Sequence, residues 1–172
     1  HGGGPQITAR LAELGIESEF RAGMRYTDEQ TIDVVKEVLR EQISKSLAEQ
    51  IQASGAKTIV LSGEDDSLFR AAKVMGKTPE GDVDLGLVGE VTTVNPRAVL
   101  KALDAGMVPV ISSVAPSTSG QLLNVNADLA ASSLAIALGA EKLMVLTDVP
   151  GLYANWPERD SLLSEISVSE LS

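Results

Sequence analysis

The sequence contains no cysteine, and its only histidine is His1. These two absences exclude disulfides, thiolate nucleophiles, Cys-type zinc sites, Ser-His-Asp catalysis and multi-histidine metal sites. Aromatic residues make up only 3% of the 172 residues, whereas hydrophobic residues make up 44%. A core of this composition has to be built mainly from Leu, Val, Ile and Ala, and the length suits one domain.

Positive charge is also scarce. The chain has 14 Lys and Arg against 24 Asp and Glu, which gives a formal net charge of −10 at pH 7. This balance argues against nucleic-acid or anionic-membrane partners, because no basic stripe is present to release counterions. No apolar run approaches the roughly 20 residues needed to cross a bilayer, and no signal peptide is visible, so we expect a cytoplasmic protein.

Both ends of the sequence predict that the chain is a piece of a longer protein. It starts on a glycine-rich turn, His1 to Gln6, with no initiator Met and no preceding strand. Near the other end, Ser167 and Glu170 have the spacing of a capping box, which predicts a helix that starts there.

Two helices are predicted in the first third of the chain. Pro5 suits a first helical position, and apolar residues at helical spacing follow it until Gly15. Thr27 and Gln30 form a T-x-x-Q capping box, which predicts the start of a long helix that ends at Gly55.

Strands and helices alternate in the rest of the chain. Continuous apolar runs predict three buried strands at residues 58–61, 108–114 and 143–146. Residues 68–74 and 88–94 predict a hairpin with a turn-rich link, residues 76–84. Asn95 is expected to be the N-cap, and Pro96 the first residue, of a helix that ends at Gly106, and residues 127–138 predict a further helix. The alternation indicates an α/β fold, a three-layer αβα sandwich with a mainly parallel central sheet.

Ligands of such sheets lie beyond the carboxyl ends of the strands, so the loops there are the candidate sites. The glycines Gly2 to Gly4 before a helix could turn backbone N–H groups toward an anion, or could form only a flexible turn. Arg25 could clamp a carboxylate with two hydrogen bonds, or could be a solvated surface charge.

Two later segments are further candidates. In the stretch Asn124 to Asp128, Asn124 could bind a polar substrate and Asp128 could orient cations, although Asn126 or Asp128 could simply cap the next helix. The Asp-Val-Pro-Gly sequence at residues 148–151 could cradle a nucleotide, or could be an ordinary β-turn.

Seven segments in this order resemble the N-acetyl-L-glutamate kinases of arginine biosynthesis, within the amino-acid kinase superfamily. They are HGGGPQI at 1–7, GMRYT at 23–27, LSGEDDSLFRA at 61–71, DLGLVGEV at 84–91, PVISSVAP at 109–116, GQLLNVNAD at 120–128 and LTDVPGLY at 146–153. Single pieces such as HGGG recur across the superfamily, whereas the combination is far more specific. The ANWPERDSLLSEI segment at 154–166 is similar to actinobacterial members.

The resemblance implies that ATP with Mg²⁺ phosphorylates the side-chain carboxylate of N-acetyl-L-glutamate. It implies an acetylglutamate-binding lobe at residues 1–141, without its first strand, and the start of a nucleotide-binding lobe at 142–172. It implies a homodimer or a hexamer of dimers, and two catalytic lysines that lie outside this chain, so the chain alone is expected to be inactive. The implied substrate-binding residues are Gly3, Gly4, Arg25 and Asn124, with Gly3 also holding the phosphoryl group and Asp128 organising the lysines. The implied nucleotide-binding residues are Asp148, Val149, Pro150, Gly151, Leu152 and Tyr153. No protein metal ligand is implied.

Two other classes share these features at the sequence level. One is a sister kinase of the superfamily: a glutamate 5-kinase, carbamate kinase, aspartokinase or UMP kinase. The other is a non-catalytic amino-acid-binding regulatory protein.

Overall fold

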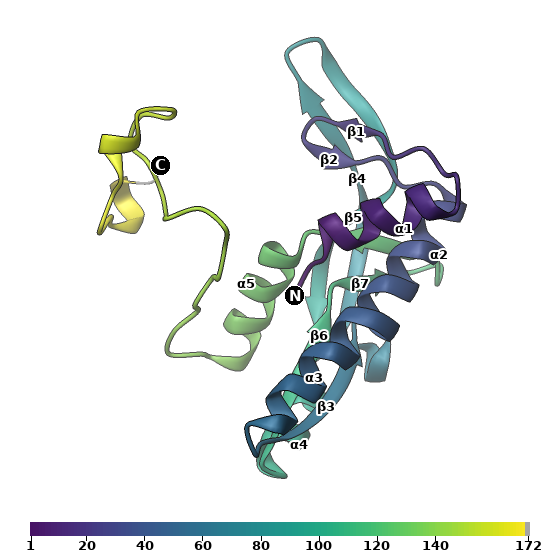
Figure 1. Ribbon diagram of the computed structural model, residues 1–172, viewed down its shortest axis with the longest axis vertical. Helices are drawn as coiled ribbons and strands as arrows, with labels where there is room; N and C mark the ends of the chain where they lie inside the picture. The colour runs from purple at the N-terminus through teal and green to yellow at the C-terminus, as the bar shows by residue number, and fades with distance from the viewer. Residues whose placement is uncertain (171–172) are drawn as a thin grey trace.

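The structure is a computed structural model that describes residues 1–170 and has an α/β architecture (Figure 1). The helices are α1 (Gly4–Glu13), α2 (Glu29–Lys36), the π-helical segment η1 (Glu37–Ile43), α3 (Ser44–Ala53), α4 (Arg97–Asp104) and α5 (Ala127–Leu138). The strands are β1 (Phe20–Arg21), β2 (Met24–Arg25), β3 (Lys57–Ser62), β4 (Phe69–Thr78), β5 (Gly81–Val94), β6 (Met107–Ser112), β7 (Val114–Pro116) and β8 (Leu122–Val125). Short 3-10 turns lie at Asp65–Ser67, Arg159–Ser161 and Val168–Glu170.

The strands pair in three groups. β3 and β6 are parallel, with Lys57 opposite Met107 and Ser62 opposite Ser112. A four-stranded group has the order β4-β5-β8-β7, in which β5 and β8 are parallel and the other neighbours are antiparallel. The small β1–β2 hairpin lies beside the long β4–β5 hairpin, which projects at the top of Figure 1.

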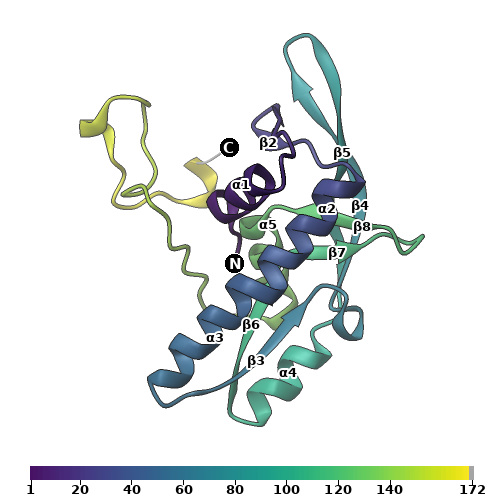
Figure 2. The same cartoon turned by 45° about the vertical axis from the view of Figure 1, so that its right-hand side comes forward.

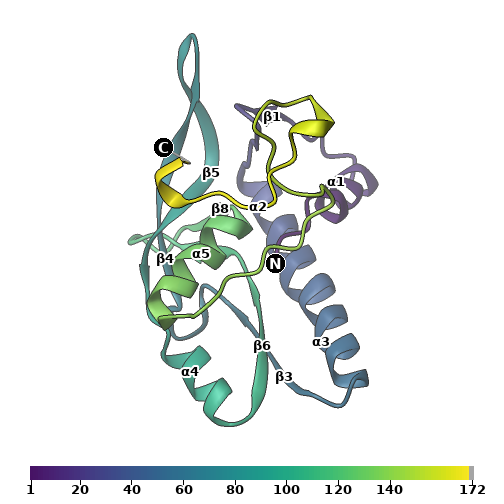
Figure 3. The same cartoon turned by 90° about the vertical axis from the view of Figure 1, so that its left-hand side faces the viewer.

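Helices cover the strands on two sides, as the sandwich prediction requires. Figure 3 shows the long helix formed by α2, η1 and α3 on one side of β3 and β6, and α4 and α5 on the other. One buried cluster joins strand residues such as Phe69 and Leu123 to Val99 of α4 and Ala130 of α5. A second cluster joins Ile7 and Leu11 of α1 to the long helix, so that α1 lies against it (Figure 2). The α/β prediction is confirmed.

The predicted long helix is confirmed, but its predicted cap is wrong. Helical residues run from Glu29 to Ala53 through α2, η1 and α3. Asp28 is the N-cap, because its carboxylate accepts a 2.8 Å hydrogen bond from the Thr31 amide. Thr27 is fully buried and its hydroxyl donates to Arg25 O instead, at 2.9 Å. A local hydrogen bond to a carbonyl two residues earlier therefore takes the hydroxyl that the capping-box pattern assigned to the helix.

The boundaries of other elements also differ from those predicted. Strands β4 and β5 continue through the predicted link at residues 76–84, and only residues 79–80 turn. Lys77 lies opposite Asp82 in this ladder, and Lys77 Nζ is 2.7 Å from Asp82 Oδ1. The predicted strand 108–114 divides into β6 and β7. Pro96, rather than Asn95, is the N-cap of α4, although Asn95 Oδ1 still accepts a 3.4 Å hydrogen bond from the Arg97 amide.

The C-terminal segment departs most from the prediction. Residues 143–146 form no strand, and Leu146 is 93% exposed. A strand needs a neighbour for its backbone hydrogen bonds, and within residues 1–170 none pairs with this run, which lies away from the sheets in Figure 1. Ser167 does bond to Glu170, as the capping box requires, with its amide donating at 2.9 Å, but the turn after it is 3-10 as far as residue 170.

No helix within residues 1–170 combines the length and the apolar character needed to cross a bilayer.

Candidate functional site

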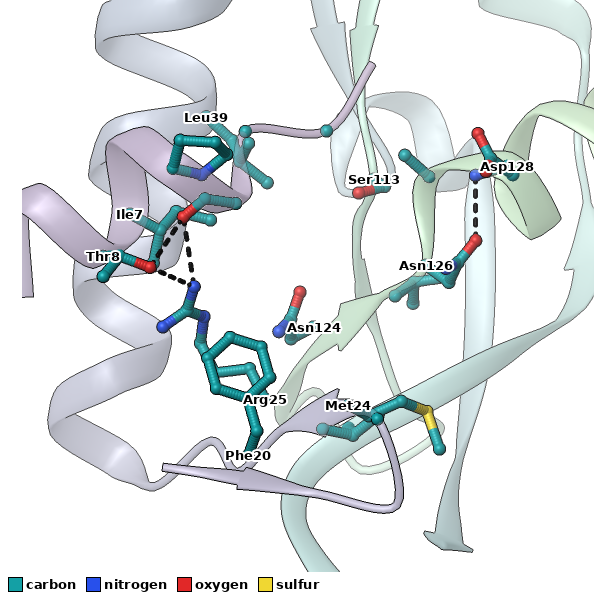
Figure 4. Close-up of a pocket in the computed structure, with 18 residues that line it drawn as sticks. Ile7, Thr8, Phe20, Met24, Arg25, Leu39, Ser113, Asn124, Asn126 and Asp128 are labelled. Atoms are coloured by element: carbon teal, nitrogen blue, oxygen red, sulfur yellow. Dashed lines mark hydrogen bonds between the residues drawn. The ribbon is translucent and has the colours of Figure 1, made fainter. Parts of the chain in front are cut away.

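A cavity of about 650 Å³ lies where α1, the β1–β2 hairpin, β8 and the start of α5 meet (Figure 4). Segments far apart in the sequence converge on it: the glycine turn, Arg25 and the stretch from Asn124 to Asp128. The structure therefore brings together the candidate substrate-binding residues Gly3, Gly4, Arg25 and Asn124 that the sequence singled out. We call this space the glycine–arginine cavity.

Arg25 is buried, with only 7% of its surface exposed. Its guanidinium donates from Nη2 to Gly4 O at 3.1 Å and to the Thr8 hydroxyl at 2.8 Å, and from Nη1 to the Ser18 hydroxyl. The Phe20 ring lies 4.7 Å from its guanidinium carbon. All three hydrogen-bond acceptors are neutral oxygens, and no ion pair to Arg25 is found among residues 1–170.

This burial has an electrostatic consequence. Removing the guanidinium from water lowers the pKa of Arg25 from its ordinary value, because no nearby carboxylate compensates for the lost hydration. The interpretation of Arg25 as a solvated surface charge is therefore wrong. A buried cation that faces a cavity without an acidic partner makes the cavity a candidate anion site.

Asn124 lies on β8 in the wall of the same cavity. Its Nδ2 donates to Thr27 Oγ1 at 3.2 Å, and the Thr27 proton is already committed to Arg25 O. The hydroxyl can therefore only accept from Asn124. The amide nitrogen of Asn124, rather than its amide oxygen, thus points toward Thr27. The amide oxygen and the second N–H of Asn124 stay available to a polar ligand.

The glycine turn approaches the long helix closely. A Cβ on Gly3 would lie 2.1 Å from Ile43 Cδ1, and one on Gly2 would lie 3.3 Å from the Ala127 Cβ. A Cβ on Gly4 would meet nothing within 4 Å. The backbone at Gly3 is thus packed against the ends of the Ile43 and Leu39 side chains, whereas Gly4 borders open space. Because both residues stand at the start of α1, their N–H groups have no acceptor within the helix.

A second helix also starts at the cavity. Asn126 is the N-cap of α5, and its Oδ1 accepts from the amides of Asp128 and Leu129 at 2.9 and 3.0 Å. Asn126 therefore has the capping role that the sequence left open. The Asp128 carboxylate lies exposed in the first turn of α5, at the cavity edge. The positive ends of α1 and α5 both add to the potential that favours an anion.

The predicted nucleotide segment does not reach the cavity. Residues 148–153 lie after α5 in an irregular stretch. There Tyr153 forms an isolated antiparallel β-bridge with Leu162, and its ring packs against Trp156 with the ring centroids 5.3 Å apart. No lysine lines the cavity within the part of the chain that is described. Residues 1–170 also hold no group of three or more Asp, Glu or His placed to bind a metal.

Sequence reasoning did not name several residues that line the cavity, among them Thr8, Phe20, Met24 and Ser113. Only Thr8 carried a signal, because it stands four residues after Gly4 and therefore on the same face of α1. The others are placed by the β1–β2 hairpin and by the bend between β6 and β7.

The whole chain, residues 1–172, matches the profile of the amino acid kinase family. Among curated proteins it is 52% identical to the acetylglutamate kinase of Arthrobacter sp. (strain FB24), covering 99% of this chain and 57% of the relative. It is 55% identical to the acetylglutamate kinase of Leifsonia xyli subsp. xyli (strain CTCB07), with coverage of 99% and 57%. The chain thus spans a little over half the length of these relatives.

Two solved structures share the fold. Protein smu.665 from Streptococcus mutans UA159 matches with a TM-score of 0.79 and 29% identity, over 90% of this chain and 61% of that one. N-acetylglutamate synthase from Neisseria gonorrhoeae matches with a TM-score of 0.67 and 24% identity, over 96% of this chain and 36% of that one.

Proposed function

Because the chain belongs to the amino acid kinase family, we propose that it forms the substrate-binding part of an N-acetyl-L-glutamate kinase. The complete protein would transfer the γ-phosphoryl group of ATP to the side-chain carboxylate of N-acetyl-L-glutamate, giving N-acetyl-L-glutamyl 5-phosphate for arginine biosynthesis. Relatives of that name at 52–55% identity support this substrate. We further propose a cytoplasmic enzyme that assembles as a homodimer or a hexamer of dimers.

The observation that carries the proposal is the buried, unneutralised guanidinium of Arg25. The chain as a whole has a net charge of −10, yet one of its cations is buried at a cavity beside two helix N-termini. N-acetyl-L-glutamate has two carboxylates and one amide. Arg25 would hold the α-carboxylate, and the free groups of Asn124 suit the polar part of the substrate.

The glycine turn suits the reacting end. Phosphoryl transfer between two anions needs alignment and positive potential more than covalent chemistry from the protein. The amides of Gly3 and Gly4 would hold the distal carboxylate and the transferred phosphoryl group. Asp128, at the cavity edge, would orient lysine ammonium groups that come from outside this chain.

The nucleotide would be held mainly by the second half of the complete protein. We propose that residues 142–172 begin that lobe, with Asp148, Val149, Pro150, Gly151, Leu152 and Tyr153 contributing to the nucleotide site. Magnesium would come to the site on the phosphates of ATP.

Trapping of the acyl phosphate tests the proposal. The complete protein is incubated with ATP, Mg²⁺ and N-acetyl-L-glutamate, and hydroxylamine converts the product to a hydroxamate that is measured by colour. We expect turnover with N-acetyl-L-glutamate and little with free L-glutamate. The reverse preference would make the protein a glutamate 5-kinase.

Calorimetry on the same protein separates the enzyme from a regulatory sensor. An enzyme binds both N-acetyl-L-glutamate and Mg-nucleotide, whereas a sensor binds an amino acid and ignores the nucleotide. For the isolated 172-residue chain we expect binding of N-acetyl-L-glutamate and almost no hydroxamate. Near-full turnover by that chain would contradict the division of roles between the two lobes.

A further inference from the structure

The Thr8 hydroxyl is hydrogen bonded in two directions at the edge of the glycine–arginine cavity. It donates to Gly4 O at 3.0 Å and accepts from Arg25 Nη2 at 2.8 Å. A hydroxyl has a single proton, so donation to Gly4 O leaves only oxygen lone pairs to face the guanidinium. The direction of both hydrogen bonds is therefore fixed.

Thr8, Gly4 and Arg25 form a closed triangle, which Figure 4 shows as three dashed lines. Arg25 Nη2 bonds to Gly4 O at 3.1 Å as well as to Thr8. Since Gly4 is the first residue of α1, the triangle ties the guanidinium to the glycine turn. The two groups that face an anion thereby keep a fixed relative position.

The neutrality of this support matters as much as its geometry. A carboxylate at position 8 would hold Arg25 more tightly, but it would also neutralise the guanidinium and repel an anionic ligand. A hydroxyl orients the guanidinium and leaves its full positive charge for the ligand. The Ser18 hydroxyl on Nη1 follows the same principle.

We propose that Thr8 is a positioning residue for Arg25, which sets the carboxylate affinity of the cavity without touching the reacting atoms. The inference rests on the proposed function for the identity of the ligand, a dicarboxylate with an acylated amine. The hold on the guanidinium itself does not depend on that identity.

A measurement without ligand tests the hold directly. In the complete protein, the ¹⁵Nη signals of Arg25 are recorded by NMR for the unchanged sequence and for Thr8→Val and Thr8→Ser. We expect slow rotation of the guanidinium, with separate Nη signals, in the unchanged protein and in Thr8→Ser. In Thr8→Val the rotation is expected to be at least fivefold faster. Equal rotation rates in all three proteins would overturn the proposal.

A kinetic measurement tests the consequence. Thr8→Val is expected to raise the KM for N-acetyl-L-glutamate about tenfold, more than it lowers kcat, and to leave the KM for ATP unchanged. Thr8→Ser is expected to restore most of the affinity. Thr8 is exposed on α1, so the substitution leaves the core intact.

Ser133→Ala is the matched control. The Ser133 hydroxyl makes the same kind of bond to the carbonyl four residues earlier, at 2.9 Å to Leu129 O, but on α5 and outside the cavity lining. It is expected to change neither KM. An unchanged KM in Thr8→Val, or an equal rise in Ser133→Ala, would overturn the role of Thr8 while the kinase assignment stands. If the unchanged protein turned over a different acid, the proposed function would fail and the NMR result would still decide the role of Thr8.

Discussion

Asn124 Nδ2 donates a 3.2 Å hydrogen bond to the buried hydroxyl of Thr27, although the two residues stand 97 positions apart in the chain. The Thr27 hydroxyl in turn donates to the backbone oxygen of Arg25 at 2.9 Å. One buried threonine therefore orients the amide of one candidate ligand residue and the backbone of another.

Thr27→Val is predicted to damage both stability and binding. Valine keeps the shape but leaves Arg25 O without its donor and frees the Asn124 amide to rotate. We expect the free energy of unfolding to fall by about 1–3 kcal/mol, measured by urea denaturation, and the Kd for N-acetyl-L-glutamate to rise. Thr27→Ser, which keeps the hydroxyl, is the control. Equal affinity in Thr27→Val would show that Asn124 needs no such support.

Arg25→Ala is predicted to lower kcat/KM for N-acetyl-L-glutamate in the complete protein by the equivalent of roughly 2–4 kcal/mol, because a charge-assisted contact to a carboxylate is lost. Arg25→Lys keeps the charge but cannot reproduce the fork that bonds to Ser18, Thr8 and Gly4 O. We expect it to recover only part of the loss. A kcat/KM that is unchanged in Arg25→Ala would remove Arg25 from the site.

Gly3→Ala and Gly4→Ala form a matched pair that separates packing from ligand contact. The Gly3 Cβ would lie 2.1 Å from Ile43 Cδ1, whereas the Gly4 Cβ would meet nothing within 4 Å. We expect Gly3→Ala to lower the free energy of unfolding by about 1–3 kcal/mol and Gly4→Ala to change it by less, while both weaken substrate binding. The second substitution Ile43→Val, which removes the clashing Cδ1, should restore stability to Gly3→Ala. If Ile43→Val does not restore the stability of Gly3→Ala, the contact with Ile43 Cδ1 is not the cause of the lost stability.

The Asp28 cap predicts a pH dependence. Hydrogen bonds from the first turn of α2, mainly from Thr31, hold the pKa of Asp28 below its ordinary value of 3.8. A carboxyl whose pKa is lower when folded contributes stability above its unfolded pKa and loses it as the pH falls through its folded pKa. We expect Asp28→Ala to cost about 1 kcal/mol at pH 7.

The same cost should shrink as the pH falls below 3.8, as measured by urea unfolding of both proteins at pH 7, 5, 4 and 3. Asp28→Asn, which keeps a capping oxygen, should lose less at pH 7 and show little of this dependence. A difference between wild type and Asp28→Ala that stays constant down to pH 3 would contradict a charged cap.

The amino-acid sequence alone determined the elements whose causes are local. Apolar spacing with a proline start and a glycine stop predicted α1, a run of small residues with a glycine stop predicted α5, and a continuous apolar run predicted β3. The glycine run before α1 predicted a candidate anion site, because helix N-termini have free amides wherever they occur.

Tertiary structure decided what depends on partners distant in the sequence. It buried Arg25 and set it against Thr8, 17 positions away, where the sequence by itself left a solvated surface charge open. It buried Thr27 and brought Asn124, 97 positions away, to donate to the Thr27 hydroxyl. It also left residues 143–146 without a strand, because an apolar run becomes a strand only where another backbone pairs with it.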